Sequence, residues 1–236
     1  MRLLAGTSGY NYDAWKGRFY PEELPSSKWL AYYAERFPTV EINSTYYRIP
    51  AAKVFTGWSA QTPDAFRFAV KASQRITHHA RLKPEAADTT RFFLERAASL
   101  GAKLGPVLFQ LPPNLKKDAA RLAAFLTTLG AGTRAAFEFR HASWFDDEIY
   151  ALLRASGAAL CIADGEDLAT PLVATAPYGY LRLRREDYGE VDLDRWAGRI
   201  RDAGWSEDVF AYFKHEDEAR GVELATGLTR RLATAA

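Results

Sequence analysis

Short apolar runs with the alternation typical of β-strands recur along the chain and predict eight strands. They are Leu3–Thr7, Thr39–Asn43, Phe66–Lys71, Pro106–Gln110, Arg134–Arg140, Ala158–Asp164, Tyr178–Arg184 and Asp208–Lys214. Between most of these runs, apolar residues recur every three or four positions, as in an amphipathic helix. Strands that alternate with helices are typical of a parallel sheet with crossover helices.

Eight such units within 236 residues fit a closed (β/α)8 barrel of the TIM type, an α/β fold, better than an open sheet. We expect one domain over residues 1–236, because no linker, low-complexity tract or long charge run divides the chain. The unit between Asp164 and Tyr178 is irregular. Pro171, Pro177 and few apolar residues argue against a full sixth crossover helix, so we expect a short helix or an extended loop.

The alternation within each strand predicts which side chains face the barrel interior. In the fifth strand Phe137 and Phe139 would face the helices, whereas Glu138 and Arg140 would face inward. The same argument turns other charged or amide residues inward near the strand ends: Glu41, Asn43, Lys71, Gln110, Asp164, Arg182, Arg184 and Lys214. Three acids against five bases predict a net positive cup that attracts phosphate or carboxylate. The alternative is a mutually neutralising network that only fills the barrel.

The composition excludes several classes of protein. A net charge of +2 gives no bulk attraction for nucleic acid, and Cys161 is the single cysteine, which excludes an internal disulfide and a thiolate metal cluster. Cys161 lies in an apolar strand and is interpreted as a core residue. The start of the chain is too short for a signal-peptide apolar region, and no run approaches the ~18 apolar residues of a membrane span. We expect a cytoplasmic protein with no membrane partner.

Three inward residues are the candidate catalytic groups. Glu41 and Glu138 could share acid and base roles if their surroundings separate their pKa values. Alternatively, Glu138 is a structural partner of Arg140 or Arg182. Lys71, buried beside other cations, would have a lowered pKa and could form a Schiff base, although phosphate binding or pairing with Glu41 is the simpler role.

The remaining candidates would bind the substrate. They are Asn43, Gln110, Arg140, His141, Trp144, Asp164, Arg182, Lys214, Tyr10 and His78. Aromatic rings at strand ends and in the loop of residues 8–27 suit stacking on sugars or bases, unless they only pack their loops onto the rim. His78, His141 and His215 could join the carboxylates around a divalent metal, but no metal-type histidine spacing is present, so a metal is not favoured and no ligand is assigned.

Six ordered segments, from the first strand onward, resemble one known family. They are Gly6–Pro21, Val40–Pro50, Phe66–Ala72, Ile76–His78, Gln110–Pro113 and Phe137–Trp144. Together they resemble the YecE-like family, the domain of unknown function 72, which implies a TIM-type barrel with a charged cup at the strand ends. Its likeness to sugar isomerases and metal-dependent apurinic endonucleases is an analogy of fold. Relatives carry His-Gly after the seventh strand and Asn-Asn-Asp after the eighth, where this chain has Arg184-Arg185 and Lys214-His215-Glu216-Asp217, so we expect a more basic cup.

These features lead to one main hypothesis and two alternatives. The main hypothesis is an enzyme, such as an isomerase or a hydrolase, that acts on a small anionic, sugar-like substrate by acid/base chemistry at the carboxyl ends of the strands. The first alternative is a barrel that binds nucleic acid or processes phosphodiesters. The second is a non-catalytic anion-binding protein.

Overall fold

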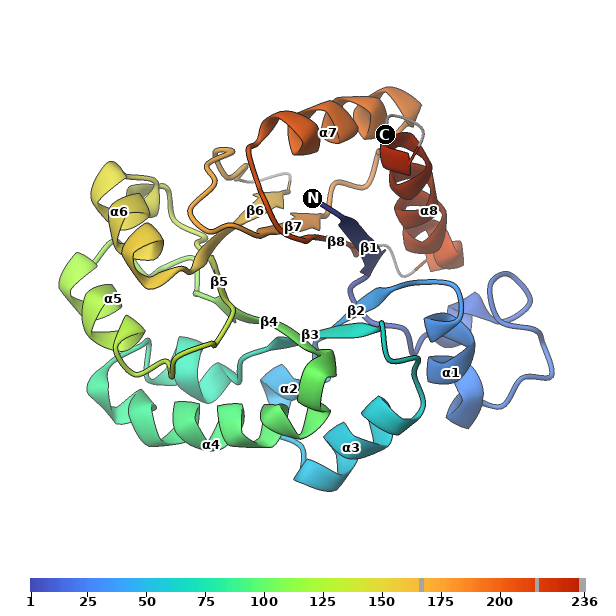
Figure 1. The fold of residues 1–236 in the computed structure, drawn as a ribbon, viewed down its shortest axis with the longest axis horizontal. Coiled ribbons are helices and arrows are strands. Elements are labelled where there is room, and N and C mark those ends of the chain that lie inside the picture. Colours follow the sequence, from blue (N-terminus) through green and yellow to red (C-terminus); the bar gives the residue numbers. More distant parts are fainter. Residues whose placement is uncertain (166–167, 215–216, 234–236) are drawn as a thin grey trace.

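Eight parallel strands form a ring in the computed structural model, which describes residues 1–165, 168–214 and 217–233 (Figure 1). They are β1 (Leu3–Thr7), β2 (Thr39–Ile42), β3 (Arg67–Lys71), β4 (Leu104–Gln110), β5 (Ala135–Glu138), β6 (Ala159–Asp164), β7 (Gly179–Leu183) and β8 (Val209–Phe213). The strand order is β1-β8-β7-β6-β5-β4-β3-β2, and all paired strands run parallel. The predicted TIM-type α/β barrel is confirmed.

Helices surround the ring of strands on its outside (Figure 1). They are α1 (Trp29–Ala34), α2 (Ser44–Tyr47), α3 (Ala52–Ala60), α4 (Ala87–Ala97), α5 (Ala119–Leu126), α6 (Asp147–Ser156), α7 (Glu190–Asp202) and α8 (Arg220–Ala233). Local signals set their ends: the Asp146 side chain caps the first turn of α6, and Gly157, with φ of 67°, ends that helix. None of the described helices is long and apolar enough to cross a bilayer.

The seam between β1 and β2 is closed by a side chain as well as by the backbone. A parallel bridge joins Ser8 to Glu41 just beyond the end of β1. Deeper in the seam, the Tyr33 hydroxyl accepts a hydrogen bond from the Thr7 N–H at 2.8 Å and donates one to the Thr39 carbonyl at 3.1 Å. This buried phenol from α1 therefore satisfies backbone groups of both strands where buried polar groups need partners.

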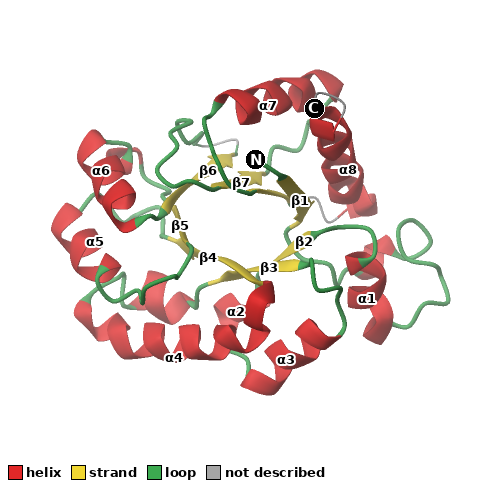
Figure 2. Ribbon diagram, viewed as in Figure 1, coloured by secondary structure: helices red, strands yellow, loops and turns green. Residues whose placement is uncertain are grey.

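The connection between β6 and β7 lacks a helix over its described residues, 165 and 168–178, and Figure 2 shows it as loop. Leu172 and Val173 pack against the core that the helices cover elsewhere. The Thr175 hydroxyl accepts from the Leu160 N–H at 2.7 Å and donates to the Ala158 carbonyl at 2.8 Å. The predicted irregular sixth crossover is confirmed, because an extended segment covers this side of the barrel.

The barrel interior is filled mainly by small residues and aromatic rings. The inward cluster consists of Leu4, Ala69, Leu108, Ala136, Ala159, Cys161, Tyr178, Tyr180, Phe210 and Tyr212. Burial raises the pKa of the Cys161 thiol, so it stays protonated as a core group. This packed layer closes the barrel below the carboxyl ends of the strands and confines any ligand to the mouth above it.

Candidate functional site

A buried arginine joins two buried glutamates at the carboxyl ends of the strands. Arg182 on β7 contacts Glu41 on β2 at 2.7 Å and Glu138 on β5 at 2.5 Å. The three side chains are 1%, 0% and 2% exposed. Burial of ions is costly unless they are paired, so these three side chains must stay together. The triad therefore fixes the relative positions of the ends of β2, β5 and β7 at the mouth of the barrel. We call Glu41, Lys71, Gln110, Glu138, Arg140, Arg182 and Arg184 the cup.

Glu41 is engaged by three side chains, two from β7 and one from just beyond β1. Tyr180 donates its hydroxyl to Oε2 at 2.6 Å, Ser8 donates to Oε1, and Arg182 holds the same oxygen. Burial alone would raise the pKa of Glu41, but Arg182 and these hydroxyls outweigh it and leave the pKa below its ordinary value. Sequence reasoning missed Ser8 as a partner of Glu41.

Glu138 is held by amide and guanidinium groups. Gln110 donates its Nε2 to both carboxylate oxygens at 2.9 and 2.8 Å, and Arg140 donates Nε to Oε1 at 3.0 Å. Burial opposes ionisation, but Arg182, Arg184 and Arg140 hold the pKa of Glu138 well below its usual range. Both glutamates are therefore anionic at neutral pH, and neither carries a proton to donate.

Lys71 at the end of β3 is a different kind of cation. Its Nζ lies 4.1 Å from the centroid of the Tyr46 ring, and among the described residues it has no carboxylate within 4.0 Å. Burial and the charge of Arg182 lower its pKa to about 7, against the opposing pull of Glu41 and Glu138. Lys71 therefore changes protonation state near neutral pH. Tyr46, its aromatic platform, was not among the predicted site residues.

A pocket of about 410 Å³ opens beside the triad. It is lined by Pro113, Glu138, Phe139, Arg140, Ala163, Gly165, Leu168, Arg184 and Glu186. The Nε of Arg184 is buried with no hydrogen-bond partner in the described part of the chain. Burial and the neighbouring Arg182 lower the pKa of Arg184, as expected where positive charge is in excess. Glu186 lies at the outer edge of this pocket and is exposed.

The loop after β3 brings His78 beside the cup. A π-helical turn, Arg75–His79, presents His78, whose ring lies 5.1 Å from the Tyr46 ring in an edge-to-face arrangement. Burial, Lys71 and Arg140 lower the pKa of His78 to about 4, so it is neutral at pH 7. Arg81 and Leu82 follow with φ of 52° and 59°, a conformation that costs side-chain-bearing residues ~1–3 kcal/mol each and that clusters at functional sites.

The structure gathers most of the predicted site residues, and a few lie at its margin. Asn43 donates to the Ser8 hydroxyl at 2.9 Å and, with Tyr10, lines an adjacent pocket of about 380 Å³. His141 bonds Ser143 at the rim, and Lys214 is exposed after β8. His215 and Glu216 lie outside the described residues.

Two predicted residues point away from the cup. Asp164 was expected to face inward, but it shares the outer face with Leu160 and Ile162, and its Oδ2 accepts from Tyr188 at 2.7 Å and from the Trp196 Nε1 at 3.2 Å. Trp144 is fully buried among core aromatics, and its Nε1 donates to the Leu115 carbonyl at 2.7 Å. Both side chains therefore contact the core that lies outside the barrel, between the strands and the helices.

Residues with metal-binding side chains do not assemble in the described structure. No group of three or more histidine, cysteine, aspartate or glutamate side chains there could hold a metal ion. The carboxylates of the cup are occupied by Arg182, and His78 bonds Thr77 at 2.9 Å. The groups of the cup that remain available to a ligand are positively charged hydrogen-bond donors. They suit an anion rather than a metal ion.

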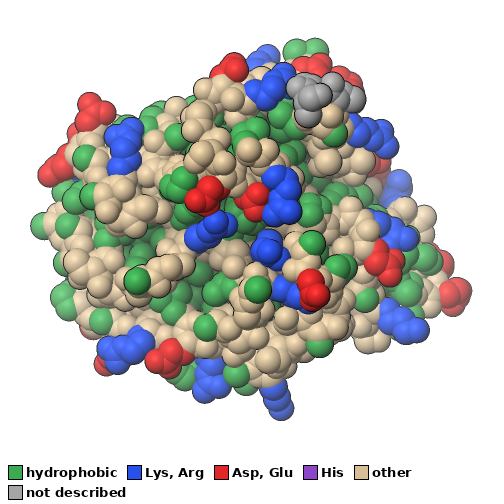
Figure 3. Space-filling view, in the orientation of Figure 1, with side chains coloured by type: hydrophobic (Ala, Val, Ile, Leu, Met, Phe, Trp, Pro, Cys, Tyr) green, Lys and Arg blue, Asp and Glu red, His purple; other side chains and the backbone are tan. Residues whose placement is uncertain are grey.

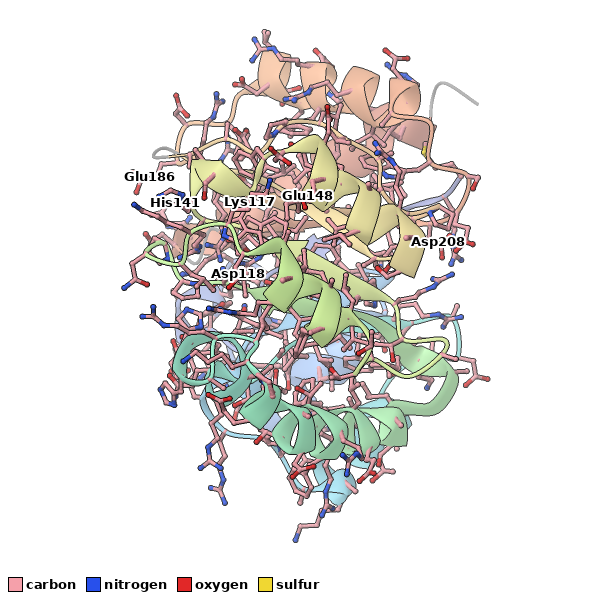
Figure 4. The ribbon with its side chains drawn as sticks, turned by 90° about the vertical axis from the view of Figure 1, so that its left-hand side faces the viewer. Lys117, Asp118, His141, Glu148, Glu186 and Asp208 are labelled. Carbon is pink, nitrogen blue, oxygen red and sulfur yellow. The ribbon has the colours of Figure 1, made fainter. Side chains whose placement is uncertain are left out.

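The opposite end of the barrel has a larger pocket of about 760 Å³, which we call the amino-end pocket. It is lined by Arg67, Arg91, Leu94, Glu95, Ala98, Ala102, Leu104, Gly105, Val107, Thr128, 130–133, Arg134 and Asp208. Figure 4 places Asp208 at one end of the molecule and His141 and Glu186 at the other. Figure 3 views the amino end, where acidic and basic side chains lie side by side over the middle of the barrel.

Cations of the amino-end pocket already have partners. Arg134 pairs with Glu207 at 2.5 Å, and Arg91 pairs with Asp88 at 2.9 Å. Arg67 donates to the carbonyls of Asp64 and Phe66. At the cup, by contrast, the Arg184 Nε is buried without a hydrogen-bond partner among the described residues.

The closed ring of parallel strands, the outer helices and the ionic cup at the carboxyl ends define a protein of the TIM-barrel class. A family model described as protein of unknown function DUF72 matches residues 4–236, and the chain belongs to this family. The resemblance inferred from the six sequence segments is thereby confirmed.

Relatives with known sequences and structures agree with this placement. The UPF0759 protein YunF of Bacillus subtilis (strain 168) is 30% identical over 197 residues, which cover 79% of this chain and 67% of YunF. The UPF0759 protein YecE of Escherichia coli (strain K12) is 34% identical over 117 residues, 49% of this chain and 43% of YecE.

Solved structures extend the likeness to the whole chain. A DUF72 family protein of Thermotoga maritima superposes with a TM-score of 0.83 and 26% identity, covering 99% of this chain and 100% of that one. A D-psicose 3-epimerase of Clostridium cellulolyticum H10, solved with D-tagatose, has a TM-score of 0.57 at 12% identity and covers 100% and 98%; it shares the fold alone.

Proposed function

We propose that this protein is an enzyme that acts on a small anionic, sugar-like substrate in the cup. The observation that carries this proposal is the excess of cations at the mouth. Within the cup, Arg140, Arg182 and Arg184 face Glu41 and Glu138, which leaves one positive charge with neutral Lys71 and two with protonated Lys71; the exposed Glu186 lies outside this count, at the outer edge of the pocket. Such a cup favours phosphate or carboxylate groups.

The anion would bind beside Arg184. The Nε of Arg184 supplies an unused donor at the pocket wall, and Arg140 is half-exposed beside it. Gln110 and Asn43 supply amides that would orient hydroxyl groups, a role that a few convergent polar groups play in small-molecule sites. The pocket of about 410 Å³ is of a size for a small metabolite.

Proton transfer would centre on Lys71 rather than on the glutamates. The ideal acid/base group has a pKa near the working pH, and Lys71 meets that condition whereas Glu41 and Glu138 remain anionic. The glutamates would position Arg182 and balance its charge. This assignment revises the expectation that a glutamate transfers the proton.

The first experiment measures thermal stabilisation of the protein by a panel of sugar phosphates and sugar acids. A compound present at 100 times its Kd should stabilise the folded state by ~2.7 kcal/mol and raise Tm by a few degrees. Compounds that raise Tm are then incubated with the protein and with Lys71→Met, and products are followed by NMR. A panel that leaves Tm unmoved would refute the proposal.

Two results would redirect the assignment to the alternatives. Stabilisation without any product would favour a non-catalytic anion-binding protein. Tight binding of single-stranded oligonucleotides, with affinity that falls steeply as salt rises, would favour nucleic-acid processing.

A further inference from the structure

We propose that Lys71 is a nucleophile that forms a Schiff base with the carbonyl group of a small anionic aldehyde or ketone. This inference rests on the anion-binding cup of the proposed function, names the substrate class and the bond formed, and gives Lys71 a covalent role in place of the proton transfer. It is carried by the surroundings of Lys71 and by a second lysine at the same end of the barrel.

The side chains around Lys71 favour a neutral amine over an ammonium. No carboxylate of the described chain lies within 4.0 Å of the Lys71 Nζ, although the face of the Tyr46 ring, with its centroid 4.1 Å away, attracts a cation and opposes this tendency. Arg182 and Arg184 are close enough to act on it electrostatically, and burial adds to their effect. A lysine that is desolvated and placed beside other cations is activated as a nucleophile.

Lys71 also lies at the carboxyl end of the strands and is less deeply buried than Arg182. Lys71 is the last residue of β3, and its relative solvent exposure is 9%, compared with 1% for the deeper Arg182. Catalytic groups of TIM barrels lie at this end of the strands. The amine is therefore at the floor of the mouth, above the packed aromatic layer.

Lys117 shows what an ordinary lysine looks like at the same end of the barrel, where Figure 4 labels it near His141. Its Nζ lies 2.7 Å from carboxylate oxygens of both Asp146 and Glu148. Hydrogen bonds to these two acids raise the pKa of Lys117. Lys117 is more accessible than Lys71, but its two acidic partners hold it as an ammonium ion. Accessibility alone would favour reaction at Lys117, whereas nucleophilicity favours Lys71.

An anionic group would direct the carbonyl toward Lys71. Arg184 offers its unpartnered Nε at the wall of the neighbouring pocket, and Arg140 lines the same pocket. Phosphate or carboxylate bound by these guanidinium groups would hold the rest of a short molecule near Lys71. The substrate is thus expected to carry its anion and its carbonyl on one short molecule.

The covalent step requires no further reagent. The lone pair of Nζ forms a bond to the carbonyl carbon, and the carbonyl π pair moves to oxygen. The two amine hydrogens leave with that oxygen as water, and the resulting imine takes up a proton to become an iminium ion. The iminium group then withdraws electrons from the neighbouring carbon, which is the usual purpose of a lysine Schiff base.

The test compares two carbonyl probes on the wild-type protein. Glycolaldehyde phosphate and uncharged glycolaldehyde are each incubated with the protein and reduced with borohydride, and labelled lysines are quantified by peptide mass spectrometry. We expect the phosphate probe to label Lys71 at least ~10-fold more than Lys117 and more than uncharged glycolaldehyde labels Lys71. Sulfate should compete with this labelling, and Arg184→Gln should reduce it.

Labelling of Lys71 no greater than that of Lys117, or equal labelling by both probes, would overturn the inference. Glycerol phosphate has no carbonyl group, so its effect on Tm tests the anion site without a Schiff base. It therefore distinguishes failure of this inference from failure of the proposed function. If it raises Tm while Lys71 remains unlabelled, the anion site stands and the Schiff base is wrong. If neither effect occurs, both are wrong. The probe comparison and the sulfate competition need no variant, so a poorly folded Arg184→Gln does not compromise the test.

Discussion

The two ends of the barrel contain ion pairs of nearly the same geometry in opposite surroundings. Arg182 contacts Glu138 at 2.5 Å at the carboxyl end, and Arg134 contacts Glu207 at 2.5 Å at the amino end. The first pair is 1% and 2% exposed, and the second is 40% and 44% exposed. Near the first pair lie Lys71 and Arg184, for which the described residues supply no carboxylate within 4.0 Å. Burial and local charge balance, rather than pocket size, therefore distinguish the candidate site.

The largest expected effect is on stability. Arg182→Met leaves Glu41 and Glu138 buried without their common counter-ion and should cost about 3–5 kcal/mol in the free energy of unfolding. Arg134→Met, the matched variant at the amino end, breaks an exposed pair and should cost under ~1 kcal/mol. Urea unfolding of both variants at pH 7 measures the difference. Equal losses would show that burial does not separate the two ends.

A rescue variant sharpens this result. Adding Glu41→Gln and Glu138→Gln to Arg182→Met removes the unpaired buried charges and should restore part of the lost stability. If the triple variant is less stable than Arg182→Met, the loss arises from packing rather than from charge.

The second effect is a pH dependence due to Lys71. Because its folded-state pKa of about 7 lies below its unfolded value, the unfolded chain binds more protons above pH 7, and stability rises with pH. Wild type should gain about 2 kcal/mol relative to Lys71→Met between pH 7 and pH 9. Urea unfolding at both pH values gives this difference. A constant difference would mean that Lys71 stays charged.

The smallest effect is expected outside the cup. Asp164→Asn changes a carboxylate that Tyr188 and Trp196 hold on the outer face, so it should alter sulfate affinity by less than about twofold. Titration calorimetry at low ionic strength measures this. A tenfold change would place Asp164 in the site after all.

The barrel and most of the cup could be predicted because strand alternation has a period of two. Glu41, Glu138, Arg182 and Arg184 were expected on the inner face from their apolar neighbours alone, and the structure places them there. Asp164 failed because a charged residue at a strand end was assumed to face inward. Its phase with Leu160 and Ile162, which pack outward, already indicated the outer face.

Other parts of the site depend on contacts that no sequence pattern encodes. Trp144 follows a strand end like a ligand-stacking ring, yet it stacks on Phe139 with centroids 4.6 Å apart in the core. Ser8 reaches Glu41 only because β1 and β2 close the ring. The sequence likewise does not show which acidic group, if any, pairs with each lysine or arginine. Those pairs determine where positive charge is unbalanced, and they can be seen only once the side chains are placed.

Sulfate binding tests the central claim most directly, because sulfate does not titrate between pH 6 and pH 8. Calorimetry at low ionic strength and pH 6 should show one site in wild type, weakened about 10-fold or more in Arg184→Gln, since hydrogen bonds to charged groups contribute ~1.5–3 kcal/mol. Arg134→Gln at the amino end should bind sulfate like wild type. Equal weakening in the two variants, or no sulfate binding by wild type, would contradict the account.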